Sequence, residues 1–279
     1  SEKEVKEGLL PSAQIAIAQE GKLLAFETFG DATNDSLYCV FSATKAITSA
    51  ASWLLIQNGK LDIQRRVSEL VPEFCRKGKQ DVTIEQLFTH TSGFPNAPFR
   101  PTDWENKNKR AKRFSDWRLN WIPGSRFEYH PTSSMWVIAD IIERVSGKLF
   151  SDYVRDHIAY QLDLPNLYIG CPEEQQHRIV DIAHVGTAMT KEDYANLGLL
   201  EPPVTEVTEE ALLKFNEAEI RKIPVPGGGG IMTAYDLAMF YQGLIGHTKS
   251  GETIWKKDTI KKATTVLTRS MQDPLTGAP

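Results

Sequence analysis

The stretch Phe41-Ser42-Ala43-Thr44-Lys45 opens a long segment with helical periodicity. Apolar residues then recur at helical spacing (Ala46, Ile47, Ala50, Ala51, Leu54 and Leu55), and Gly59 stands where a C-terminal glycine cap is expected. Because Ser42 and Lys45 are three residues apart, their side chains share one helix face. We expect Ser42 at or near the N-cap, where free N–H groups and the helix dipole favour negative charge. The stretch therefore predicts an activated serine nucleophile.

The same pair has an ordinary interpretation. Ser42 could be a simple N-cap and Lys45 a solvated helix residue, since short matches of this kind arise by chance. A lysine acts as a base only when its pKa lies well below the usual value of about 10.4. Burial on an apolar helix and a second cation would lower the pKa in this way. The pair alone therefore leaves both interpretations open.

Composition excludes several classes of function. The chain has 279 residues, of which 41% are hydrophobic and 24% charged, as in a soluble globular protein with a large core. The net charge is -4 and no stretch is dominated by lysine and arginine, so we expect no nucleic-acid partner. No apolar run reaches transmembrane length and no secretory segment precedes the first strand, so we expect no membrane partner and a cytoplasmic location.

Cysteines and histidines give no sign of a metal centre. Cys39, Cys75 and Cys171 are far apart and odd in number, which argues against a disulfide framework and a CxxC metal site, although one disulfide with a free thiol stays open. The histidines show no metal-ligand spacing. We expect a reducing compartment and no cofactor.

The remaining patterns predict a mixture of strands and helices. Residues 13–28 indicate a largely buried hairpin that turns at 20–22. Thr83 and Gln86 form a capping-box pattern for a short helix that ends before 89–93. Further helices are expected over 137–145, 150–158 and 234–245, the last capped by Thr233, while most of 164–210 stays unassigned.

Residues 94–120 lack clear periodicity and are predicted to form a surface excursion that borders a pocket. Phe99 and Trp104 are therefore candidate substrate-binding residues. Gly227-Gly228-Gly229-Gly230 either cradles an anion or forms a tight turn near the pocket floor, and Gly228 and Gly229 are candidates for substrate contact. His90 is expected to be a buried turn residue, with catalysis as the alternative.

Four ordered stretches resemble the serine β-lactamase and penicillin-binding-protein superfamily, nearest its class C β-lactamase and esterase branch. They are Ser42 to Lys45, Val82 to Phe94 with Leu-Phe-Thr-His-Thr-Ser-Gly, Pro123 to Gly147 with Tyr129, and Gly228 to Phe240. The resemblance implies an α+β fold, an antiparallel sheet flanked by helices with an inserted, mostly helical region. The sheet-containing domain would comprise 1–45 and 215–279, and the insert 46–214.

The resemblance also implies an acyl-serine mechanism. Ser42 would attack a carbonyl carbon, Lys45 would take or relay its proton, and Tyr129 would act as a phenolate or as a proton shuttle to the leaving group. Two departures stand out. The branch carries asparagine two residues after the tyrosine, where Pro131 stands here; His130 could supply that lost polarity, with a structural histidine as the alternative.

The second departure concerns the superfamily's late strand, which carries a lysine or histidine, then a small hydroxyl or other residue, and then glycine. His247-Thr248-Lys249 resembles it only superficially, so we expect the C-terminal strands to be missing from this chain. The predicted function is hydrolysis of small carboxylic esters, or acyl transfer. The alternatives are a β-lactamase or D-alanyl-D-alanine peptidase, and a catalytically silent binding protein on the same scaffold. The expected partner is a small-molecule ester or amide, and the oligomeric state stays open.

Overall fold

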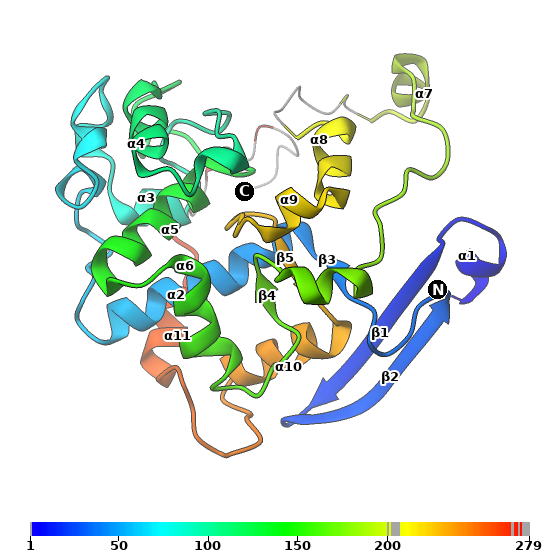
Figure 1. The fold of residues 1–279 in the computed structure, drawn as a ribbon. Helices are drawn as coiled ribbons and strands as arrows, with labels where there is room; N and C mark the ends of the chain where they lie inside the picture. Colours follow the sequence, from blue (N-terminus) through cyan, green and yellow to red (C-terminus); the bar gives the residue numbers. More distant parts are fainter. Residues whose placement is uncertain (1, 200, 202–206, 269–270, 273, 275–279) are drawn as a thin grey trace.

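Two long helices form the centre of the fold, α2 (Thr44–Gln57) and α5 (Ser133–Ser146), which pack against each other. Figure 1 shows them in a computed structural model that describes residues 2–199, 201, 207–268, 271–272 and 274. Both helices are buried over most of their length because apolar residues occupy nearly every inward position. The glycines predicted to end them, Gly59 and Gly147, both adopt left-handed backbone.

A small antiparallel sheet lies beside the start of α2. Its strands are β3 (Tyr38–Cys39), β5 (Gly230–Met232) and β4 (Tyr168–Ile169), in the order β3-β5-β4. Tyr38 pairs with Met232 and Tyr168 with Ile231, so β5 is buried between its neighbours. Because β3 leads into Ser42 and β5 begins at the last glycine of the run, this sheet brings the two motifs side by side.

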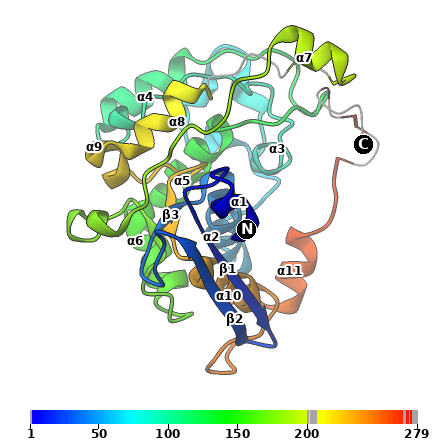
Figure 2. The same ribbon diagram turned by 90° about the vertical axis from the view of Figure 1, so that its right-hand side faces the viewer.

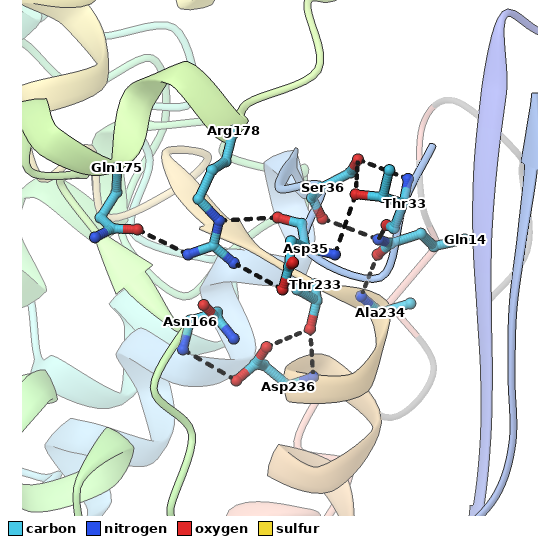
Figure 3. Close-up of polar contacts among 10 residues, drawn as sticks. All are labelled: Gln14, Thr33, Asp35, Ser36, Asn166, Gln175, Arg178, Thr233, Ala234 and Asp236. Carbon is cyan, nitrogen blue, oxygen red and sulfur yellow. Dashed lines mark hydrogen bonds and ion pairs between the residues drawn. The ribbon is translucent and has the colours of Figure 1, made fainter. Parts of the chain in front are cut away.

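A separate antiparallel hairpin contains β1 (Ser12–Gln19) and β2 (Lys22–Gly30), as the sequence predicts. Helix α10 (Ala234–Leu244) packs on one face of it (Figure 2). The Gln14 side chain joins the hairpin to the start of α10 and to the loop that follows β2. Its amide nitrogen donates to the Thr33 and Ser36 carbonyls at 2.6 and 2.9 Å, and its amide oxygen accepts from the Ala234 N–H at 3.0 Å (Figure 3).

The start of α10 is fixed by a second group of contacts in the same region (Figure 3). The buried Asp236 carboxylate accepts from the Thr233 hydroxyl and from the Asn166 N–H, and Thr233 caps the helix as predicted. Burial raises the pKa of Asp236, against the hydrogen bonds that stabilise its charged form. The strand β5 that precedes α10 is thereby held in place from its C-terminal end.

The hairpin is less buried than predicted. Side chains alternate along β1, so Gln14, Ala16 and Ala18 share the half-buried face while the two isoleucines point the other way. Ile17 is 54% exposed, and Leu24 at the tip of β2 is 60% exposed. The prediction of a largely buried hairpin is therefore wrong, because α10 covers only one face.

Shorter helices complete the α+β fold, whose class is confirmed. They are α1 (Glu2–Lys6), α3 (Ile84–Phe88), α4 (Lys107–Asp116), α6 (Phe150–Val154), α7 (Lys191–Asn196), α8 (Glu209–Leu213), α9 (Ala218–Lys222) and α11 (Lys257–Ala263). The Thr83 capping box is present, and α6 continues as a π-helical turn over Arg155–Ala159. Among the described residues, no helix is long and apolar enough to cross a membrane. The division into two domains stays a prediction.

Candidate active site

Ser42 lies on a tight 3-10 turn, Phe41–Ala43, that joins β3 to α2. The helix proper begins at Thr44, so Ser42 precedes the N-cap Ala43 by one residue and its side chain is exposed. Phe41 has a φ of 41°, a left-handed conformation that costs a residue other than glycine about 1–3 kcal/mol. Its ring contacts the edge of Phe215 at a centroid distance of 5.6 Å. The strained turn presents the serine hydroxyl outward.

The Lys45 amine lies beside this hydroxyl in a buried position. Its Nζ is 3.0 Å from Ser42 Oγ and donates to the Gly227 carbonyl at 2.8 Å. Burial lowers the pKa of Lys45, and the neighbouring Tyr129 hydroxyl opposes that effect only in part. Because the neutral amine has a free electron pair, this environment favours the form of Lys45 that can accept the proton of Ser42.

Tyr129 completes the group from a third segment. Its hydroxyl donates to Ser42 Oγ at 2.8 Å, and Lys45 Nζ lies 5.0 Å from the centre of its ring. The tyrosine is 42% exposed and sits in an irregular segment ahead of α5. The three residues that the sequence places in catalysis therefore meet at one oxygen.

The glycine run is fastened to α2 by three side chains on one helix face. Thr48 donates to the Pro226 carbonyl at 2.7 Å, Lys45 to Gly227, and Thr44 Oγ1 accepts from the Gly230 N–H at 2.8 Å. Sequence reasoning missed the two threonines, although their spacing of four residues next to Lys45 in an apolar helix is a detectable signal. The run is thus a tight turn beside the serine, as the plainer prediction had it.

The two candidate glycines have different surroundings within this turn. A Cβ at Gly228 would meet only Phe41 backbone atoms at 4.0 Å, whereas a Cβ at Gly229 would lie 2.8 Å from Val225 Cβ. Gly228 therefore borders the turn that carries Ser42, while Gly229 is packed against its own loop. Substrate contact by either glycine stays a prediction.

Three other candidates lie elsewhere. His130 has no exposed surface and bonds to Ser92 and to the Glu128 carbonyl, so in this structure it cannot contact a substrate. Phe99 and Trp104 are buried in the main core, where both rings pack on Trp136 at centroid distances of 4.3 and 5.1 Å. The surface excursion predicted for 94–120 instead inserts its aromatic side chains into the core, because their apolar area is more stable there.

The late strand expected from the resemblance is not represented by His247-Thr248-Lys249. That stretch lies in the loop after α10, where Lys249 pairs with Asp163 at 2.7 Å.

Comparison with known proteins shows the family to which the chain belongs. The family described as Beta-lactamase matches residues 2–278. The chain is 29% identical over 171 residues to protein flp of Staphylococcus aureus strain MW2, a match that covers 56% of this chain and 34% of flp. It therefore spans about a third of the length of this curated relative.

Solved structures give a similar result over a larger share. A penicillin-binding protein homolog from Caulobacter crescentus has a TM-score of 0.77 and 25% identity, covering 95% of this chain and 72% of the other. A family VIII carboxylesterase has a TM-score of 0.75 and 26% identity, covering 93% and 71%. The family model matches almost the whole of this chain, and Lys45 and Tyr129 both contact the Ser42 hydroxyl oxygen. This chain therefore belongs to the Beta-lactamase family.

Proposed function

We propose that this protein is a serine hydrolase that cleaves small carboxylic esters through an acyl-Ser42 intermediate. One observation carries the proposal: Lys45 Nζ and Tyr129 Oη converge on Ser42 Oγ at 3.0 and 2.8 Å. A nucleophile with a base and a second proton carrier in contact is what acyl transfer requires. The match to a family VIII carboxylesterase supports the choice of esters.

The reaction follows from the protons that each group can hold. Neutral Lys45 accepts the Ser42 proton as Oγ attacks the ester carbonyl, which becomes a tetrahedral oxyanion. Tyr129 donates its proton to the departing alkoxide and regains one from the Lys45 ammonium. Water then attacks the acyl-serine, its proton passes to the same pair, and the acid leaves as Ser42 is restored. If an alcohol replaces water, the product is a new ester.

Pro131, the residue after His130, favours ester substrates over lactam substrates. Proline at 131 has no side-chain donor for the amide of a lactam or peptide substrate, whereas an ester lacks that amide. The relatives include proteins described as β-lactamases, so a lactam-hydrolysing enzyme is the competing activity. A silent binding protein on this scaffold would keep the fold without turnover.

The test combines turnover with covalent labelling. The wild-type protein should hydrolyse p-nitrophenyl acetate and butyrate faster than nitrocefin, and a small fluorophosphonate should add one adduct by intact mass. Ser42→Ala should abolish both, while Ser125→Ala is the control, because Ser125 is an exposed serine that bonds to the Ile122 carbonyl. Ester turnover that persists in Ser42→Ala would refute the mechanism. Faster nitrocefin turnover would select the lactamase, and a folded protein with neither turnover nor adduct would select the binding protein.

A further inference from the structure

Tyr129 needs support that its own side chain does not provide. The residue is 42% exposed, and the residues around it form neither helix nor strand. Yet its hydroxyl must stay within hydrogen-bonding distance of Ser42 Oγ, because displacement of a catalytic group by about 1 Å can cost 10²-fold in rate. The backbone on both sides of Tyr129 must therefore be fixed by other groups.

His130 fixes the residue before Tyr129. Its Nδ1 lies 2.6 Å from the Glu128 carbonyl oxygen, which can only accept, so Nδ1 carries the proton. The unprotonated Nε2 then accepts from the Phe94 N–H at 3.3 Å and lies 3.0 Å from Ser92 Oγ. One buried imidazole thus joins the carbonyl of Glu128 to the turn that starts after α3.

His90 fixes the residue after Tyr129. Its Nδ1 accepts the backbone N–H of His130 at 3.1 Å, and its carbonyl accepts the backbone N–H of Glu128 at 3.2 Å. Its ring also lies against the Tyr129 ring, at a centroid distance of 4.9 Å. Both neighbours of Tyr129 are therefore bound to the same histidine.

Both imidazoles must be neutral for these contacts to hold, because each uses one ring nitrogen as an acceptor. Burial lowers the pKa of His90 to about 3 and that of His130 to about 4. Neutral rings also add no positive charge beside Lys45, whose amine must be able to lose its proton.

We propose that His90 and His130 are positioning residues that hold the Tyr129 hydroxyl on Ser42. The proposal rests on the proposed function only for its kinetic consequence, since the hydrogen bonds exist without turnover. The rival explanation is that the two histidines merely fill the core. The two explanations differ in which ring nitrogen matters for activity.

Substitution by asparagine or glutamine tests the contribution of each ring nitrogen of His130 on its own. Asparagine places its amide where Nδ1 stands, and glutamine reaches to the place of Nε2. His130→Asn keeps the bond to the Glu128 carbonyl and loses the bonds to Ser92 and Phe94, and His130→Gln does the reverse. We expect His130→Gln to lower kcat by about 10²-fold with KM nearly unchanged, and His130→Asn to keep most of kcat although it leaves the larger cavity.

The same logic applies to His90, where only an acceptor at Nδ1 is needed. His90→Asn should keep kcat, and His90→Gln should lower it. In a Tyr129→Phe background neither glutamine variant should cause a further loss, because the residue through which they act has lost its hydroxyl. Losses that persist in that background, or asparagine variants as slow as the glutamine ones, would overturn the proposal.

A spectroscopic readout makes the test independent of catalysis. In protein labelled with ¹³Cζ-tyrosine, the Tyr129 resonance is assigned by its absence in Tyr129→Phe. His130→Gln should shift it, and His130→Asn should leave it in place. The His90 variants are not used for this readout, because they also remove the ring that lies 4.9 Å from the Tyr129 ring. If the wild type hydrolyses no ester, the proposed function fails while this comparison still decides the positioning role. An unmoved resonance in folded His130→Gln protein would refute it.

Discussion

Alanine at Gly229 should destabilise the protein, whereas alanine at the adjacent Gly228 should not. A Cβ at 229 would lie 2.8 Å from Val225 Cβ and 3.2 Å from the Val225 backbone N and O, and backbone atoms cannot move aside by a change of rotamer. A Cβ at 228 would find its nearest neighbours, in the Phe41 backbone, at 4.0 Å. Neither glycine has the left-handed φ that would itself penalise alanine.

The expected magnitudes follow from these contacts. Overpacking of this kind costs about 1–3 kcal/mol, so Gly229→Ala should lower the free energy of unfolding by that amount. Gly228→Ala should be neutral or stabilising by up to about 1 kcal/mol, since it restricts the unfolded chain. Because Val225 and Gly229 lie in the loop that bonds Lys45, Gly229→Ala should also lower kcat.

Urea unfolding followed by tryptophan fluorescence measures the difference, and ester turnover measures its effect on the site. The pair is closely matched, because the two changes are adjacent and chemically identical. A rise in KM for bulkier esters in Gly228→Ala alone would establish that this glycine borders the substrate. Equal free energies of unfolding for the two variants would refute the packing argument.

Three further predictions concern a base, a buried cation and the core. Because burial lowers the pKa of Lys45, kcat/KM should rise with pH through a midpoint below the ordinary lysine value, and Lys45→Arg, which stays charged, should lack both the activity and this limb. Lys79 is fully buried, and burial lowers its pKa to about 8 from the value of 10.5 that it has in the unfolded chain. The free energy of unfolding of the wild type should therefore rise by up to about 3 kcal/mol between pH 8 and 10.5, relative to that of Lys79→Met. Parallel pH profiles of the two proteins would contradict this prediction. Phe99→Ala should lower the free energy of unfolding by about 3–5 kcal/mol without altering KM. A change in KM with an unchanged free energy of unfolding would instead indicate that Phe99 contacts the substrate.

Local chemistry was the part of this fold that could be predicted from sequence. The capping box at Thr83, the glycine after α5 and the serine-lysine spacing each depend on residues a few positions apart, and all are present. Tyr129 was found through its resemblance to a family motif, and its distance from Ser42 agrees with that choice.

Long-range packing could not be predicted in the same way. Phe99 was placed at a pocket because its surroundings lack periodicity, but its burial depends on Trp136, 37 positions later by the residue numbers. The exposed face of the hairpin depends on which elements cover it, and Gln14 meets α10 from more than 200 residues away. His130 gave no local sign of its bond to the Phe94 N–H, because that partner lies 36 residues away in the sequence.

The way the active site is attached has a consequence for how its specificity can change. Ser42, Lys45 and the glycine run are joined through one helix, so a substitution there alters nucleophile, base and turn at once. Tyr129 lies on a separate segment, which is held by the hydrogen bonds of His90 and His130. New substrate preferences should therefore arise most easily on the tyrosine side, away from its two histidine anchors, where variation leaves the nucleophile intact, and laboratory evolution libraries would be best concentrated there.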